Sequence, residues 1–194
     1  MSRRGGLAAA LGTALAAGGA AAAVAATAPQ PVAAPDPKGD VRSTLDLTRL
    51  SFERASDGRL RAAITLAAEW GADTLVARSG PPGSICLKLW TVSQPPDAPP
   101  DYLVCVTTDK KGDLRGSVLK ERANKLPERV GSADVARPSG RSVTLRFSQT
   151  AVGRPARVAV GAESTRPGCT RGSCIDTAPD APNALPLTLR KAET

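Results

Sequence analysis

The four cysteines are the residues whose spacing most directly indicates chemistry, and that chemistry is disulfide formation. Suppose that Cys86 and Cys105 face each other across an antiparallel hairpin. Every residue pair on the other face of this hairpin, which carries Leu87, is then apolar. Directly opposed residues also lie within disulfide range. Cys169 and Cys174 enclose only four residues, a loop that a local bridge can close. We therefore predict the pairs 86–105 and 169–174. The alternative is a four-thiolate zinc site, which usually needs closely spaced cysteine pairs.

In the same hairpin register, Trp90 lies on the outer face, next to Lys88 and opposite Asp101. A flat ring flanked by charged, hydrogen-bonding groups can stack on a sugar ring and bind its hydroxyl groups. We therefore predict a carbohydrate-binding site at Trp90, Lys88 and Asp101. The alternative is that a second sheet covers this face and buries the ring.

Four aspartates flank the ends of the expected fold. Asp36 and Asp40 precede the first predicted strand, and Asp176 and Asp180 precede the last. If those two strands are neighbours, the four carboxylates could converge on a calcium ion, which takes about six to eight oxygen ligands. No EF-hand spacing is present, so the alternative is a set of solvated loop aspartates.

The chain contains no histidine, which excludes several classes of catalytic site. Ser-His-Asp and Cys-His nucleophile systems, zinc-bound water held by histidines and histidine-ligated haem all need that side chain. A glycosidase would need two carboxylates at a set separation, and the spacing of the glutamates singles out no pair among Glu69, Glu121, Glu128 and Glu163. No nucleophile elbow, P-loop or dinucleotide fingerprint occurs. We predict that the protein is not an enzyme.

The charge balance is basic, with 26 Lys+Arg against 18 Asp+Glu and a formal net charge of +8. Nucleic-acid binders concentrate such charge on one face and interleave aromatic residues, whereas here the arginines are scattered and only five residues are aromatic. We therefore predict no nucleic-acid partner. The arginines either form an ordinary solvated surface or attract an anionic extracellular polymer, such as a wall polysaccharide.

The first 28 residues have the order of a secretory signal peptide: Arg3 and Arg4, an uncharged Ala/Gly/Leu run, and small residues that offer A-x-A cleavage sites. The alternative is a retained membrane anchor. We predict cleavage, leaving a secreted chain of charge 24 − 18 = +6 with no membrane span. Residues 29–40 are rich in proline and alanine and are expected to be a linker. The folded domain is predicted over residues 41–194.

Alternating apolar and polar residues recur along the rest of the chain and predict about nine strands. A change of parity near Thr48 and Arg49 indicates a bulge in the first strand. Residues 60–70 also fit a helix, but Gly58 and Gly71 at the two ends and the neighbouring strands favour a strand. With frequent Gly/Pro turns between the runs, the expected fold is all-β, a single antiparallel β-sandwich. The segments are 45–52, 60–70, 85–91, 102–108, 114–120, 133–137, 142–148, 157–164 and 185–190.

The segment Asp36-Pro37-Lys38-Gly39-Asp40, followed by the Leu45-Asp46-Leu47 strand and a long alternating strand from Leu60, resembles the start of carbohydrate-binding-module family 9 and DOMON-type β-sandwiches. Haem-binding DOMON domains use methionine and histidine ligands, so this chain does not fit that branch. Sugar-binding members hold a sugar in a clamp of aromatic rings. The resemblance implies that role for Trp70, Trp90 or Tyr102.

Together these features predict a secreted, non-catalytic β-sandwich domain that binds an extracellular carbohydrate or wall polymer. The alternative is a structural or interaction domain of the cell envelope with no small ligand. Calcium is the one cofactor that the residues suggest.

Overall fold

The computed structural model describes residues 30–41, 43–92, 95, 98–109, 111–169, 174–180 and 182–189. The predicted signal peptide, residues 1–28, lies outside these residues and stays a prediction. Within the described residues the fold is all-β and antiparallel, as expected, and no described residue is in an α-helix. Among these residues, no helix is long and apolar enough to cross a membrane.

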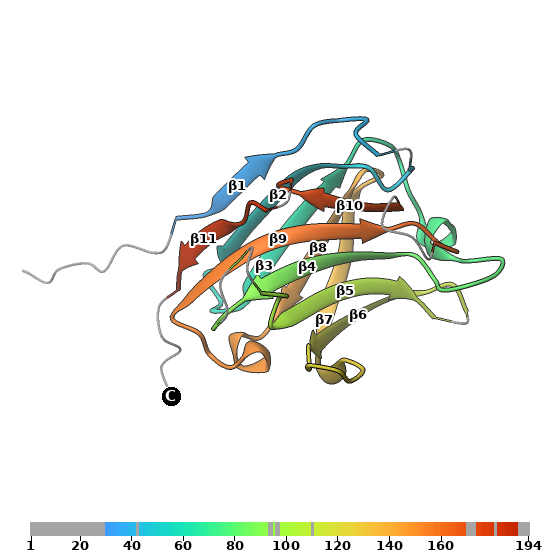
Figure 1. Ribbon diagram of the computed structural model, residues 1–194. Helices are drawn as coiled ribbons and strands as arrows, with labels where there is room; N and C mark the ends of the chain where they lie inside the picture. Colours follow the sequence, from blue (N-terminus) through green and yellow to red (C-terminus); the bar gives the residue numbers. More distant parts are fainter. Residues whose placement is uncertain are drawn as a thin grey trace, which may run out of the picture.

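Eleven strands form in the described residues, and each of the nine predicted segments overlaps one of them (Figure 1). The strand predicted over residues 60–70 ends at Leu66, and residue 190 of the last predicted segment lies outside the described residues. Two short 3-10 turns, η1 (Ala72–Leu75) and η2 (Gln149–Val152), connect some of the strands. The strands are β1 (Val32–Pro35), β2 (Leu47–Arg54), β3 (Leu60–Leu66), β4 (Ser84–Trp90), β5 (Tyr102–Thr108), β6 (Leu114–Lys120), β7 (Glu128–Ser139), β8 (Ser142–Phe147), β9 (Arg157–Thr165), β10 (Ile175–Ala178) and β11 (Leu185–Thr188).

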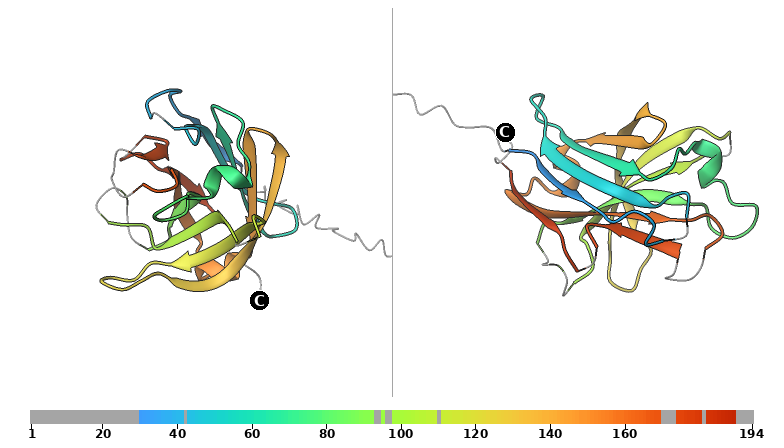
Figure 2. Two further views of the ribbon diagram at one scale, coloured as in Figure 1. Left: turned by 90° about the vertical axis from the view of Figure 1, so that its right-hand side faces the viewer. Right: turned by 90° about the horizontal axis from the view of Figure 1, so that it is seen from above.

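The strands make one continuous sheet, in the order β1-β2-β3-β8-β7-β6-β5-β4-β9-β10, with β11 also paired to β9. The predicted two-sheet sandwich is therefore wrong, and the fold is nearly barrel-like. The reason is β7, whose first half, up to Ala133, pairs with β6 while its second half, from Asp134, pairs with β8. This strand carries the sheet around the core, and the β10 end comes back to contact β2 (Figure 2).

The N-terminal strand β1 corrects the predicted linker. Residues 32–35 lie within the expected 29–40 linker, yet they pair antiparallel with β2, from Val32 opposite Phe52 to Pro35 opposite Arg49. Proline is tolerated there because β1 is an edge strand, and an edge strand has one side without ladder hydrogen bonds. The folded part of the chain therefore begins before residue 41.

The core fills the inside of the rolled sheet and follows the predicted alternation. Leu60, Ala62, Ile64 and Leu66 of β3 are fully buried, which confirms the strand for that segment and excludes the helix. The register between β2 and β3 shifts at Leu47/Arg49, where the bulge was predicted. The buried side chains of both halves of the sheet meet in one cluster that includes Leu50, Phe52, Leu87, Val104, Leu145 and Phe147.

The hairpin of β4 and β5 has the predicted register. Cys86 lies opposite Cys105, with Leu87 opposite Val104 and Lys88 opposite Leu103. Both predicted disulfides, Cys86–Cys105 and Cys169–Cys174, are present, and no free cysteine remains. Two disulfides are typical of proteins from an oxidising environment such as the cell exterior.

Candidate binding pocket and acidic cluster

Trp90 is the last residue of β4 and lies on the outer face of the sheet, as its position in the hairpin predicted. Only 8% of the residue is exposed, so it is not the open, flat platform that carbohydrate stacking was expected to use. Its indole N–H donates a hydrogen bond to the carbonyl oxygen of Ala98, at 2.9 Å. Ala98, which lies between β4 and β5, therefore holds the ring in one orientation.

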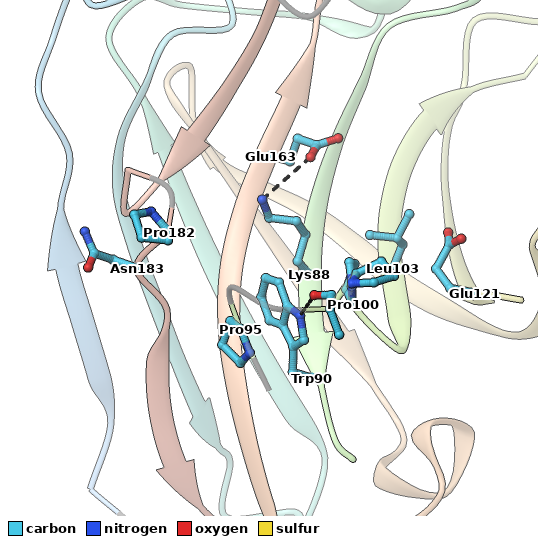
Figure 3. Close-up of a pocket in the computed structure, with 11 residues that line it drawn as sticks. Lys88, Trp90, Pro95, Pro100, Leu103, Glu121, Glu163, Pro182 and Asn183 are labelled. Atoms are coloured by element: carbon cyan, nitrogen blue, oxygen red, sulfur yellow. Dashed lines mark hydrogen bonds and ion pairs between the residues drawn. The ribbon is translucent and has the colours of Figure 1, made fainter. Parts of the chain in front are cut away.

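A pocket of about 520 Å³ lies beside the indole of Trp90 (Figure 3). Its apolar walls are mostly prolines: Pro95, Pro99 and Pro100 come from the β4–β5 loop, and Pro182 follows β10. Its polar side chains are Lys88, Glu121, Glu163 and Asn183. The pocket thus combines rigid apolar surfaces with a few charged or hydrogen-bonding groups, the usual composition of a small-molecule site.

Lys88 and Glu163 project from the neighbouring strands β4 and β9 into this pocket (Figure 3). The Nζ atom of Lys88 lies 3.6 Å from Oε2 of Glu163 and 5.8 Å from the centroid of the Trp90 ring. Because both charged side chains are partly exposed, they are accessible to a ligand and to water. The pair can therefore offer donors and acceptors to a ligand that carries hydroxyl groups.

Asp101 has a different role from the one predicted. Its Oδ2 atom accepts hydrogen bonds from the backbone N–H groups of Thr91 and Val92, at 2.6 and 2.8 Å, and from the Thr91 hydroxyl at 3.2 Å. Asp101 is not among the residues that line the Trp90 pocket. The register prediction was right, but the carboxylate binds the end of its own hairpin, where the backbone of β4 leaves the ladder.

The sequence does not place Glu163, Pro182 or Asn183 beside Trp90. The glutamate belongs to β9, and the other two follow β10, so both segments are far from β4 in the chain. Alternation marks Glu163 as outward-facing, but only the pairing of β9 with β4 places it beside Lys88. Trp70, the other tryptophan considered as a sugar platform, is 3% exposed and packs in the core with Arg137 over its ring.

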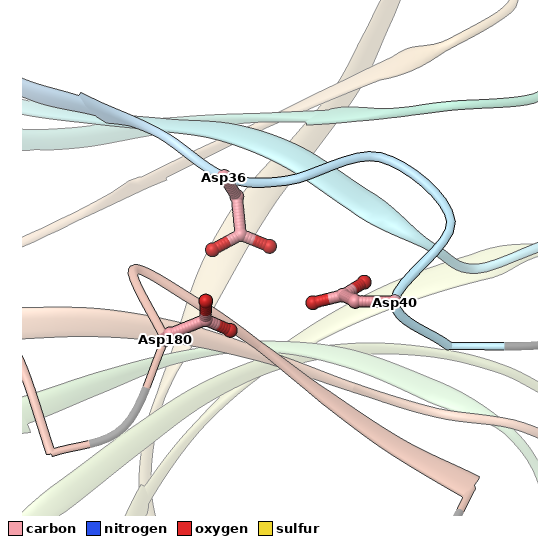
Figure 4. Close-up of side chains that lie close together, drawn as sticks. All are labelled: Asp36, Asp40 and Asp180. Carbon is pink, nitrogen blue, oxygen red and sulfur yellow. The ribbon is translucent and has the colours of Figure 1, made fainter.

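A second group of residues gathers where the two ends of the sheet meet. The carboxylate oxygens of Asp36, Asp40 and Asp180 lie within 4.8 Å of one another (Figure 4). Asp40, Asp46 and Asp176 form a second such triad that shares Asp40 with the first. The predicted convergence of Asp36, Asp40, Asp176 and Asp180 is therefore seen. The sequence does not single out Asp46 for this cluster, because it lies between two leucines of a predicted strand, whereas β2 begins only at Leu47.

Backbone N–H groups bind part of this acidic cluster. Asp46 Oδ2 accepts from Gly39 at 2.9 Å, and the Asp176 carboxylate accepts from Leu47 at 2.5 Å and from Thr177 at 2.8 Å. Asp36 differs: it is 8% exposed, and neither of its carboxylate oxygens has a hydrogen bond of normal geometry within the described residues. Oδ1 of Asp46 is likewise buried without a partner there.

Burial and mutual repulsion raise the pKa values of these carboxyl groups. The pKa of Asp36 rises to about 7, first because burial disfavours the charged form and then because Asp176, Asp180 and Asp40 are close; the nearby N–H of Asp180 opposes the rise. Burial also raises the pKa of Asp176 to about 6, against the N–H of Leu47. The pKa of Asp46 is raised, mainly by burial.

In the presence of a chelator, we expect the melting temperature to fall as the pH is raised from about 5 to about 8. Asp36 and Asp176 have pKa values of about 7 and about 6 in the folded chain, against an ordinary value of 3.8. Between these values the folded state holds protons that the unfolded chain has lost. This stabilisation is complete below the ordinary pKa and is lost as the pH rises through the folded values.

Thermal melts in buffers of equal ionic strength measure this dependence. Because the chain has no histidine, no such side chain titrates in the same range and masks the effect. Asp40, Asp46 and Asp180 face the two groups, and the positive charge of Lys38 acts on Asp46. The variant Asp36→Asn should flatten the curve above about pH 6. A melting temperature that rises over this range would contradict the prediction.

Comparison with known proteins identifies no relative of this chain: no family model, no curated protein and no solved structure matches it. The resemblance to carbohydrate-binding-module family 9 and DOMON-type domains therefore stays a prediction from the sequence. The geometry of the pocket and of the acidic cluster is the basis for the proposals below.

Proposed function

We propose that the protein is a secreted, non-catalytic binding domain whose pocket at Trp90 takes an extracellular carbohydrate. The observation that carries this proposal is the pocket itself, in which an aromatic ring and several prolines face Lys88, Glu163 and Asn183. Its volume of about 520 Å³ lies within the range of ligand sites, about 300–1,000 Å³. The two disulfides and the predicted signal peptide support a location outside the cell.

The charges around the pocket favour a neutral or amine-bearing sugar over an anionic polymer. Lys88 is paired with Glu163, and Glu121 adds a second carboxylate to the lining. The pocket therefore has no excess of positive charge, although the whole chain carries +8. An anionic wall polymer would bind to the arginines elsewhere on the surface, and such binding would weaken steeply with salt.

A structural or interaction domain of the cell envelope is the second candidate. The small exposed fraction of Trp90 and the hydrogen bond of its N–H to Ala98 favour this role, since a ring held by its own loop can serve the fold alone. The two candidates differ in a measurable way. Only the binding domain needs the polar side chains around the ring.

Screening against neutral glycans and insoluble wall polysaccharides, followed by calorimetry, is expected to find a ligand whose affinity changes little with salt. Asn183→Ala should weaken binding without affecting the fold, because Asn183 is exposed. Trp90→Ala should weaken it at least about tenfold, since stacking contributes more than area burial alone. Glu163→Gln keeps the shape of the side chain but removes its charge and should also reduce affinity.

The control is Thr188→Ala, which changes an exposed residue of β11 that is not part of the pocket lining. It should bind as the unaltered protein does. Melting curves recorded for every variant separate loss of binding from loss of fold. Absence of any bound glycan, or binding that survives all three pocket substitutions, would leave the structural role as the better account.

A further inference from the structure

The acidic cluster brings five carboxylates together, and hydrogen bonds satisfy only some of their oxygens. Five carboxylates meet there, from Asp36 after β1, Asp40 and Asp46 before β2, Asp176 in β10 and Asp180 after β10. The carboxylate of Asp36 points toward Asp40 and Asp180 (Figure 4). A buried carboxylate that lacks hydrogen bonds of normal geometry destabilises a protein unless a cation or a proton compensates its charge. A cation bound beside Asp36 would therefore stabilise the folded chain.

The distances fit a calcium ion. Calcium binds oxygens at about 2.3–2.6 Å, so two of its ligands on opposite sides of the ion lie roughly 5 Å apart. The oxygens of Asp36, Asp40 and Asp180 all lie within 4.8 Å of one another, as do those of the second triad. One ion could therefore touch all three carboxylates of a triad.

The donor set selects among metals. Zinc in proteins is bound mainly by cysteine and histidine, but this chain has no histidine and its cysteines are in disulfides. Magnesium demands near-ideal octahedral geometry and keeps several waters, whereas calcium accepts irregular shells of carboxylate and carbonyl oxygens. A cluster made only of carboxylates on loops and strand ends is therefore best suited to calcium.

We propose that calcium binds to Asp36, Asp40 and Asp180 and locks the two ends of the rolled sheet together. Asp36 and Asp40 belong to the β1–β2 end, and Asp180 belongs to the β10 end. In the described sheet, these ends are not joined by ladder hydrogen bonds. They are connected by the backbone N–H of Leu47, which donates to the carboxylate of Asp176, and by the hydroxyl of Ser164, which donates to the carbonyl oxygen of Leu45. Asp46 and Asp176 form a second triad together with Asp40. This second triad adds negative charge and can bind a second ion.

This site shares no side chain with the proposed carbohydrate pocket, although the backbone N–H of Asn183 donates to the carbonyl oxygen of Asp180, at 3.0 Å. Its function is mechanical. Without calcium, the repulsion among the carboxylates loosens the contact between β1–β2 and β10. With calcium, the same carboxylates join the β1–β2 end of the sheet to its β10 end. Extracellular modules bind calcium with Kd values of about 10⁻⁴–10⁻³ M, which suits a secreted protein.

The test is calcium binding and calcium-dependent melting of the secreted chain after treatment with chelator. Calorimetry should find one or two calcium ions per chain. Calcium at about a hundred times its Kd should raise the melting temperature by about 5–10 °C, because it binds only the folded state. Magnesium at the same concentration should have a much smaller effect. Hydrogen exchange should slow in β1 and β10 when calcium is added.

Two substitutions make the test specific. Asp40 is exposed, so Asp40→Asn should fold normally but bind calcium at least about tenfold more weakly. Asp36→Asn should abolish the calcium response while leaving the chelated protein as stable as before, or more stable at about pH 8, because it removes an uncompensated buried charge. A residue with a merely structural role would not show this opposite pair of effects.

The matched control is Asp113→Asn, in an exposed turn before β6 where the carboxylate contacts only an exposed arginine among the described residues. It should retain the full calcium response. Superimposable melting curves with calcium and with chelator, together with no heat of binding, would overturn the proposal. A calcium response that persists unchanged in both Asp36→Asn and Asp40→Asn would overturn the assignment of the site.

Discussion

Removal of the Cys86–Cys105 disulfide by the double substitution Cys86→Ala/Cys105→Ala is expected to lower the free energy of unfolding by about 3 kcal/mol. The bridge joins residues 19 apart, so its loss gives the unfolded chain much more conformational freedom. For a domain of this size, the change corresponds to a decrease in melting temperature of about 6–12 °C. Alanine is the suitable replacement because both cysteines are buried and serine would bury a hydroxyl group.

The second disulfide provides the comparison. Cys169 and Cys174 are only 5 residues apart, so Cys169→Ala/Cys174→Ala should cost less than the first double substitution. Peptide mapping under non-reducing conditions checks that each variant keeps the other bridge. Equal losses for the two variants, or a larger loss for the second, would contradict the expected dependence on loop length.

The second large effect is expected from Gly116→Ala, a change of one methyl group in β6. Gly116 is buried opposite Ala133, the residue at which β7 passes from β6 to β8. A Cβ atom at Gly116 would overlap the carbonyl oxygen of Ala133 and lie 2.9 Å from Cγ2 of Val135. Because the first obstacle is backbone, the β6–β7 ladder must shift, and we expect a loss of about 3 kcal/mol or more.

Gly161→Ala is the matched control, since Gly161 is also a buried glycine within a strand. An added Cβ there would meet Cε of Lys88 at 3.5 Å and Cζ3 of Trp90 at 3.6 Å, which are ordinary contacts. Chemical denaturation of both variants gives the comparison. If Gly116→Ala were no less stable than Gly161→Ala, the close approach of β7 to β6 at this corner would be refuted.

Local patterns in the sequence determined most of the strands. Alternation placed nine segments correctly, because one face of each strand packs on the core and the other faces outward. The hairpin register of β4 and β5 followed from the Cys86–Cys105 pairing together with the apolar partners of Leu87, since a slip of one residue would reverse every side chain. The bulge near Thr48 was also visible, because it changes the parity of the pattern.

The short strands β1 and β10 needed the tertiary structure. Each has four residues, and the alanine and proline of one and the polar residues of the other give no clear alternation. Their strand conformation depends on pairing with β2 and β9, which the rest of the fold supplies. For the same reason, the closing of the sheet into a roll could not be predicted: it depends on one strand, β7, serving two neighbours.

Each of the two candidate sites has some features that follow from local spacing and others that depend on the fold. Spacing along the chain predicts that Trp90 and Lys88 share the outer face of a hairpin and that aspartates flank the ends of the fold, because both are local features. The burial of Asp36, the position of Asp46 in the cluster and the contact of Glu163 with Lys88 all depend on how distant segments pack in the fold. Leu47 and Asp176, for example, are 129 residues apart and meet only because the sheet curves back on itself. A pattern with a period of two residues carries no information about that curvature.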